Sequence, residues 1–320
     1  MAAEPVLQKY SAKINEVVLG KEPKVIKIGG EEGLPFLFKE GKIPNRPRIA
    51  FEIWDVAPSD WPEELAVQYK DVFKSPLEWA KKCVQEYNAQ ILCLKLQGAH
   101  PDFGNRSPEE EAKLVGNLIN KIDVPLVILG CGDDTKDNEV LPVCSQAAQG
   151  RRCLFGDAVQ DNYRTLTVAV LADGHNIIAE SPIDINIAKQ LNILISDMGM
   201  PAERMVINPT IGALGYGLEY AYSIMERARL AALSGDKMLA MPFVCFVGQE
   251  AWRAKEAKAK QDEFGQWGPE VERGRIWEAA TAVALLQSGA DLLIMRHPNS
   301  INYVNTYIEE CFGESNENQR

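Results

Sequence analysis

The sequence is poor in the residues that bind metals. It contains three histidines and seven cysteines in 320 residues, and no two cysteines are spaced as in a Cys-x-x-Cys motif. Zinc and iron–sulfur sites need several such ligands at recognisable spacings, so we expect neither a metal site nor an iron–sulfur cluster in this chain. The odd number of cysteines also argues against a disulfide framework.

Positive charge and long apolar segments are scarce as well. Lys and Arg number 34 against 45 Asp and Glu, which gives a net charge of −11. Such a surface repels a phosphate backbone, so nucleic acid is not an expected partner. No apolar run approaches the roughly 18 residues that a membrane-spanning helix needs, and the N-terminus lacks the apolar core of a signal peptide. We therefore expect a cytoplasmic protein with no membrane partner.

What the sequence does contain is eight short apolar runs, each ending in a polar or glycine residue and followed by a helical stretch. Continuous apolar runs are typical of strands that are buried on both faces of a parallel sheet. Eight strands alternating with helices predict an α/β fold of the (β/α)8 (TIM) barrel type. The runs occupy residues 48–53, 91–96, 125–130, 152–156, 176–181, 205–210, 241–248 and 292–297.

We divide the chain into three parts. Residues 48–312 form the barrel, and residues 1–47 form an N-terminal extension whose segment 25–30 indicates a short β-ribbon with glycine turns. We expect this ribbon to close the bottom of the barrel. The end of the chain, residues 313–320, is expected to be frayed.

Ser-Pro pairs mark the starts of several helices. Ser75 and Ser107 each precede a proline at the first helical position, and a glutamate follows, which is the pattern of an N-cap. Ser181 likewise leads into a segment with apolar residues at helical spacing, which Gly199 ends. These signals place helices between the strands, as a (β/α)8 barrel requires.

The functional residues of such barrels lie at the carboxyl ends of the strands. Here those ends carry a mixed set of side chains that matches no acid–base, nucleophile or metal template, so we name no catalytic residue. A carboxylate pair between Glu52 and Glu180 would have to form across the barrel, which sequence does not reveal. The strand ends supply Glu52, Asp55, Lys95, Cys131, Asp133, Asp157, Glu180, Asn208, Arg296 and His297.

Glycine-rich loops follow three strands, at residues 130–134, 156–158 and 208–217. Glycine lets a backbone approach a ligand closely, and successive N–H groups can bind an anion. Tight turns alone would explain the same glycines. Both explanations stay open at this point.

The loops after the first and seventh strands are long and rich in tryptophan. Long loops at this end of a barrel are usually functional, and their tryptophans would suit an interface or a large flat ligand. The alternative is that they cover the barrel rim within the subunit. The residues concerned are Trp54, Trp61, Trp252 and Trp267.

Segments spread over the whole chain resemble a known family. They include FEIWDVAPSDWPEEL, LVILGCGDDTKDNEVL, SPIDINIAKQLNILI and IGALGYGLEYAYSIMERARLAAL. These segments are similar to the small subunit of the corrinoid iron–sulfur protein, the methyl carrier of the anaerobic acetyl-CoA (Wood–Ljungdahl) pathway. The resemblance implies a (β/α)8 barrel in a heterodimer with a large subunit, which carries the [4Fe-4S] cluster and most of the corrinoid-binding domain.

The same resemblance implies a non-catalytic role in which the chain helps to bind and cover the corrinoid (a cobamide) without ligating cobalt. Its other partners would be a methyltetrahydrofolate:corrinoid methyltransferase, which methylates the cobalt, and acetyl-CoA synthase/CO dehydrogenase, which receives the methyl group. From strand position alone, we predict corrinoid contacts at Gly130, Cys131, Gly132, Asp133, Asn208, Gly212, Gly215, Tyr216, Arg296 and His297.

Two other functions stay open. Related barrels bind methyltetrahydrofolate at the same mouth through Asp and Asn side chains, so the chain would be a pterin-binding methyltransferase that uses Asp133, Asp157 and Asn208. A third function is that of a scaffold for the methyltransferase, with corrinoid contact incidental.

Overall fold

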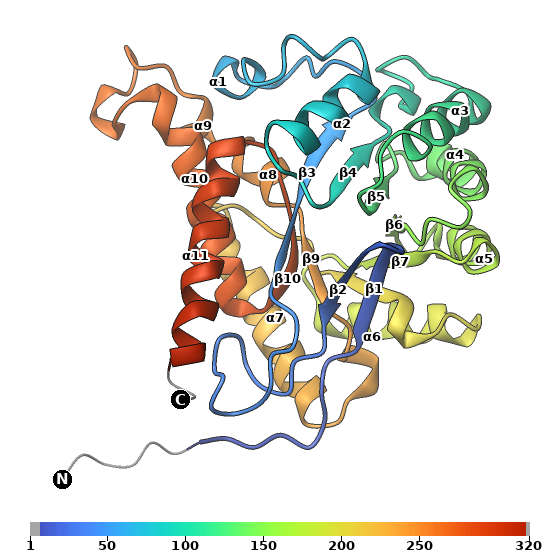
Figure 1. Ribbon diagram of the computed structural model, residues 1–320, viewed down its shortest axis with the longest axis vertical. Coiled ribbons are helices and arrows are strands. Elements are labelled where there is room, and N and C mark those ends of the chain that lie inside the picture. Colours follow the sequence, from blue (N-terminus) through green and yellow to red (C-terminus); the bar gives the residue numbers. More distant parts are fainter. Residues whose placement is uncertain (1–6, 318–320) are drawn as a thin grey trace.

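The apolar runs form a closed barrel of parallel strands in a computed structural model, which describes residues 7–317 (Figure 1). The strands are β3 (Arg48–Trp54), β4 (Leu92–Lys95), β5 (Leu126–Leu129), β6 (Leu154–Ala158), β7 (Asn176–Glu180), β8 (Met205–Asn208), β9 (Phe243–Cys245) and β10 (Ala290–Met295). Neighbours along the chain pair with each other, and β10 closes the barrel on β3. Each strand overlaps the run that predicted it, so the (β/α)8 barrel is confirmed.

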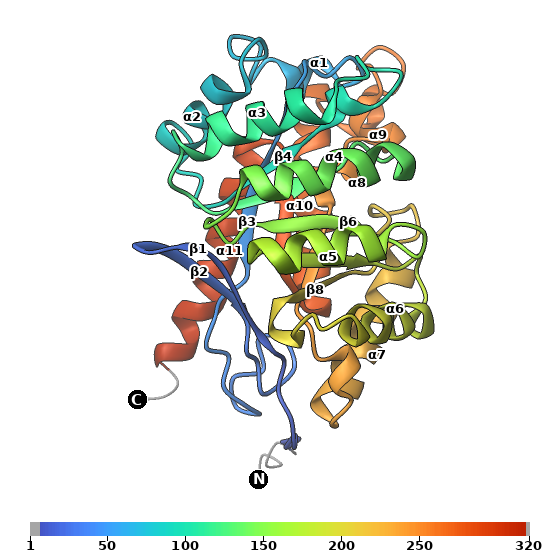
Figure 2. The same cartoon turned by 90° about the vertical axis from the view of Figure 1, so that its right-hand side faces the viewer.

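Helices connect the strands and surround them (Figure 2). The long helices are α2 (Pro76–Gln85), α3 (Pro108–Ile119), α4 (Asp134–Ala147), α5 (Tyr163–Asp173), α6 (Ile185–Asp197), α7 (Leu218–Leu233), α10 (Glu270–Ser288) and α11 (Pro298–Glu317). Three short helices lie in the two long loops, namely α1 (Glu63–Ala66), α8 (Val247–Ala251) and α9 (Lys255–Lys258). Among the described residues, no helix is both long and apolar enough to cross a membrane.

The three predicted helices are confirmed, and serine caps two of them. The side chains of Ser75 and Ser107 accept hydrogen bonds from the backbone N–H groups at the third helical positions of α2 and α3. The helix predicted after Ser181 is α6, and its N-cap is Asp184, which accepts from the N–H groups of Asn186 and Ile187. An aspartate is at least as good an N-cap as a serine, and it lies directly before the first helical turn.

Alternate strand residues fill the barrel interior. One buried cluster contains Ala50 of β3, Cys93 of β4, Ile178 of β7, Val206 of β8 and Ile294 of β10. Because side chains of a strand alternate between its two faces, the residues two positions further along also point inward. They form the top layer of the barrel at the carboxyl ends of the strands: Glu52, Lys95, Glu180, Asn208 and Arg296.

The N-terminal extension closes the opposite end. It contains an antiparallel ribbon of β1 (Glu16–Lys21) and β2 (Lys24–Gly29), whose apolar residues Val17 and Leu19 join the interior cluster. Figures 1 and 2 both show this ribbon on the side of the barrel away from α8 and α9. The predicted β-ribbon is therefore confirmed. The boundaries of our three-part division stay a prediction, since α11 continues to Glu317 and the last three residues lie outside the described ones.

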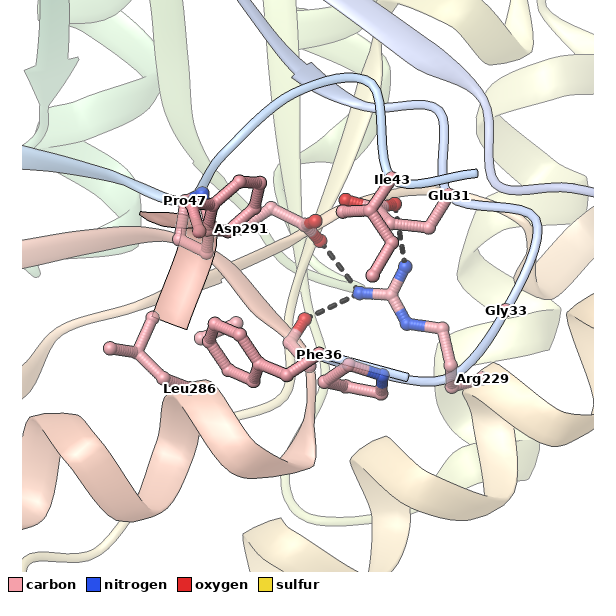
Figure 3. A pocket seen from close by; sticks show the side chains of 12 residues that line it. Glu31, Gly33, Phe36, Ile43, Pro47, Arg229, Leu286 and Asp291 are labelled. Atoms are coloured by element: carbon pink, nitrogen blue, oxygen red, sulfur yellow. Dashed lines mark hydrogen bonds and ion pairs between the residues drawn. The ribbon is translucent and has the colours of Figure 1, made fainter. Parts of the chain in front are cut away.

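A buried charge network joins the extension to the barrel (Figure 3). Arg229 of α7 lies between Glu31 of the extension, at 3.1 Å, and Asp291 of β10, at 2.8 Å. The cavity beside it has a volume of about 20 Å³, which is room for about one water molecule. The contact between the extension and the barrel therefore leaves little free space beside Arg229.

Candidate functional site

A buried ion pair occupies the side of the mouth where the first and last barrel strands meet. Arg296 donates from Nε to Glu52 Oε2 at 2.9 Å and from Nη2 to Glu52 Oε1 at 2.7 Å. Burial alone would raise the pKa of Glu52, but the charge and hydrogen bonds of Arg296 lower it. Arg296 is 4% exposed. Glu52 is thus paired with Arg296 and not with Glu180.

A second buried carboxylate binds the backbone of the segment that carries Arg296. Glu278 of α10 accepts hydrogen bonds from the backbone N–H groups of Arg296, at 2.6 Å, and His297, at 3.1 Å. The His297 ring stacks on Trp252, and burial lowers its pKa to about 4. His297 is therefore neutral near pH 7, and its ring packs inside the subunit.

The tryptophans of the two long loops cover this side of the mouth. Trp54, Trp61 and Trp252 are all buried, and the Arg296 guanidinium lies over the rings of Trp54 and Trp61 at 5.5 and 5.0 Å. For these three, covering the rim within the subunit is the correct alternative. Trp267 differs, because it is 38% exposed and stacks on Phe264 at the surface.

The loop after β5 satisfies its own backbone donors. The N–H groups of Cys131 and Gly132 donate to the Asp137 carboxylate at 2.7 and 3.0 Å, so a carboxylate of the chain fills the position that an external anion would take. Asp133 caps α4 by accepting from the N–H of Lys136 at 2.8 Å. Our sequence analysis missed Asp137, although a carboxylate in the first turn of the following helix is a detectable signal.

The loop after β8 is shaped mainly by its turn. A side chain at Gly212 would collide with the backbone oxygen of Tyr216, and Gly215 and Gly217 have positive φ angles. The turn therefore requires these glycines. The Tyr216 hydroxyl donates to Glu256 Oε2 at 2.9 Å, while its ring is half exposed.

The opposite side of the mouth carries carboxyl groups with few partners. Asp157 Oδ1 is buried and has no hydrogen-bond partner within residues 7–317. Burial and the charge of Glu180 raise the pKa of Asp157 well above its ordinary range, against a hydrogen bond from Asn208. Burial also raises the pKa of Glu180. Across the described part of the chain, no group of three or more His, Cys, Asp and Glu residues could hold a metal ion.

The family model for the CO dehydrogenase/acetyl-CoA synthase delta subunit matches residues 16–306. Delta subunits of the acetyl-CoA decarbonylase/synthase complex from Methanocaldococcus jannaschii and Methanosarcina mazei are 37% and 35% identical to this chain. These alignments cover 93% and 96% of this chain and 74% and 72% of the two relatives. The chain belongs to this delta-subunit family.

Among solved structures, the chain is similar to dihydropteroate synthases. The enzyme from Xanthomonas albilineans with 4-aminobenzoic acid has a TM-score of 0.58 and 15% identity, covering 93% of this chain and 98% of that one. The enzyme from Yersinia pestis in a sulfonamide drug complex has a TM-score of 0.56 and 13% identity, covering 86% and 97%. At such low identity the likeness shows the barrel fold alone.

These comparisons correct our functional prediction. The resemblance to the small subunit of the corrinoid iron–sulfur protein is wrong, because the family model and the relatives identify a delta subunit of the acetyl-CoA decarbonylase/synthase complex. The function that we based on that resemblance is wrong for the same reason. The alternative of a pterin-binding methyltransferase gains no support from the delta-subunit relatives.

For the delta-subunit barrel, the ten predicted contact residues all lie at the carboxyl ends of the strands or in the loops that follow them. Five are buried: Gly130, Cys131, Asn208, Arg296 and His297. Five are partly or fully exposed: Gly132, Asp133, Gly212, Gly215 and Tyr216. The structure therefore brings the ten residues to one end of the barrel but not to one surface.

Proposed function

We propose that this chain is a subunit of an acetyl-CoA decarbonylase/synthase-type complex and that the mouth of its barrel faces a corrinoid of that complex. The observation that carries the proposal is the delta-subunit family match over nearly the whole barrel. The partners that we propose are other subunits of such a complex, one of which would hold the corrinoid.

The chemistry of the mouth suits such contacts. A corrinoid periphery is rich in amide groups, which donate hydrogen bonds to carboxyl and amide oxygens. Asp133 supplies such oxygens from a partly exposed position in the loop after β5. Together with the half-exposed Tyr216, Asp133 suits a surface that contacts a corrinoid held by another subunit.

The three histidines make contacts within the subunit. His297 is buried against Trp252, and His175 is held inside the barrel wall by hydrogen bonds to the Cys153 N–H and the Ser145 carbonyl. His100 is partly exposed, and its Nδ1 accepts from the N–H of Asp102. A corrinoid would supply the cobalt chemistry, and this chain would supply contacts to its periphery through Gly132, Asp133, Gly212, Gly215 and Tyr216.

The experiment is to purify the chain alone and together with the other subunits, and to measure cobalt and the corrinoid spectrum in each sample. We expect a stable complex that contains cobalt, and an isolated chain that contains none. Tyr216→Ala, matched with Tyr303→Ala on the exposed surface of α11, should change the corrinoid spectrum of the complex. A complex without cobalt, or identical spectra for wild type and Tyr216→Ala, would count against the corrinoid contact. Failure to form any complex would refute the subunit role itself.

A further inference from the structure

A cavity of about 330 Å³ opens beside the mouth, between the loop after β6, the end of β7 and helix α6. Its size lies at the lower end of the range for small-ligand sites, roughly 300–1,000 Å³. One wall is apolar and contains Ile187, Leu191 and Leu194 of α6. Ile187 is 37% exposed, so apolar surface is available to a ligand.

The polar part of the cavity consists of carboxyl, amide and hydroxyl groups. Asp134, Asp161 and Glu180 line it together with Gln160, Gln190 and Thr210, and none of its eleven described lining residues is Lys or Arg. An anionic ligand would meet three carboxyl groups with no compensating cation in the wall. Coulomb interactions therefore favour a positively charged ligand.

The Thr210 hydroxyl is a hydrogen-bond donor to Glu180. The Thr210 hydroxyl lies 2.7 Å from the Ser181 carbonyl oxygen and 3.2 Å from Glu180 Oε1. A hydroxyl has one hydrogen to donate, so Thr210 shares it between two acceptors, and the Ser181 carbonyl has the shorter contact. Glu180 Oε1 accepts the longer and weaker hydrogen bond. Among the described residues no cation forms an ion pair with Glu180, and Lys95 acts on it only through its charge.

We propose that this cavity binds an organic cation, an ammonium or guanidinium-type group on an apolar stem, with its charge at Glu180 and Asp161 and its stem against α6. The source of the cation is either a Lys or Arg side chain of a partner subunit or a free small molecule. The site lies at the rim of the mouth and is independent of the proposed corrinoid contact, so either proposal can fail without the other.

Three probes that share one ring test the charge preference. Benzamidine is cationic, benzamide is neutral and benzoate is anionic, and the apolar part is the same in all three. Titrated into the isolated chain and followed by thermal shift and calorimetry, benzamidine should bind saturably, benzamide more weakly and benzoate not at all. Equal binding of benzamidine and benzoate, or no benzamidine binding at about 10 mM, overturns the proposal.

Two variants test the position of the charge. Glu180→Gln and Asp161→Asn should each weaken benzamidine binding by about tenfold or more, whereas Glu203→Gln, an exposed carboxylate at the other end of the barrel, should leave it unchanged. Asp161 is an exposed loop residue, so its variant tests the site even if the Glu180 variant does not fold. Unchanged binding in Asp161→Asn overturns the placement.

The pH dependence gives a further readout. Asp157 of β6, Asp134 of α4 and Lys95 of β4 are the charged groups that face Glu180. Benzamidine should bind more tightly as pH rises and Glu180 loses its proton, and Glu180→Gln should remove this rise. If the assembled complex no longer binds benzamidine, a partner side chain fills the cavity. If it still does, the natural ligand is a free molecule.

Discussion

The two sides of the barrel mouth both carry buried carboxyl groups, but only one side also supplies a cation to pair with them. On the side of β3 and β10, Glu52 and Arg296 satisfy each other in a buried bidentate pair. On the side of β6 and β7, Asp157 and Glu180 lie close enough to raise the pKa of Asp157, and neither has an ion-pair partner in the described part of the chain. In the first arrangement each buried charge has its partner, and in the second the carboxyl groups have no cation to pair with among the described residues.

Breaking the paired side should have the largest effect. Arg296→Met leaves the Glu52 carboxylate buried without its cation, which costs about 3–5 kcal/mol of unfolding free energy. Urea denaturation of wild type and variant measures this loss.

The double variant Glu52→Leu/Arg296→Met is the matched control, because it removes both charges. It should recover much of the stability, since replacing a buried ion pair by apolar groups is often close to neutral. A loss below about 1 kcal/mol in Arg296→Met would show that the pair does not hold this side of the mouth.

The sequence predicted the barrel that carries both sides of the mouth, but it did not predict which carboxyl groups would be paired. The barrel was predictable because a strand buried on both faces must be apolar along its whole length, and eight such runs leave few alternatives. The pairing of Glu52 with Arg296 was not predictable, because the two residues are 244 positions apart and meet only when the barrel closes. Arg296 was consequently predicted as a ligand contact on its strand position alone.

Side chains of the subunit itself occupy two places where the sequence suggested an external ligand. The backbone donors of Cys131 and Gly132 suggested an anion site, but Asp137 lies within one helical turn and occupies them. The tryptophans of the long loops are large enough to fill the rim, and three of them do. The wrong family prediction has a different origin, since it relied on overall similarity of segments and not on any residue with a defined chemical role.

An intermediate effect is expected where Asp137 fills the loop after β5. Asp137→Ala leaves the N–H groups of Cys131 and Gly132 without an acceptor, which should lower the unfolding free energy by about 1–3 kcal/mol. Asp137→Asn keeps one acceptor oxygen and should lose less. Glu139→Gln on the exposed face of the same helix should change stability by less than about 0.5 kcal/mol. Equal stability of Asp137→Ala and Glu139→Gln would contradict this account of the loop.

The smallest change, and the one of opposite sign, is expected on the unpaired side. Burial and the charge of Glu180 raise the pKa of Asp157 in the folded protein, so folding favours the protonated form. The resulting stability is fully present below the ordinary pKa of an aspartate, about 4, and is lost as pH rises through the folded value. Asp157→Asn removes the ionisation, so the variant should lose less stability than wild type as pH rises, and at pH 8 it should be more stable by about 1 kcal/mol.

Unfolding free energies of wild type and Asp157→Asn, measured at intervals from about pH 4.5 to pH 8.5, provide the test. Asp161→Asn is the matched control, because Asp161 lies on the same loop but is exposed, and its curve should parallel that of wild type. Parallel curves for wild type and Asp157→Asn would mean that Asp157 is already compensated in the free subunit. The two sides of the mouth would then be alike, and the unpaired carboxyl groups would no longer indicate a missing ligand.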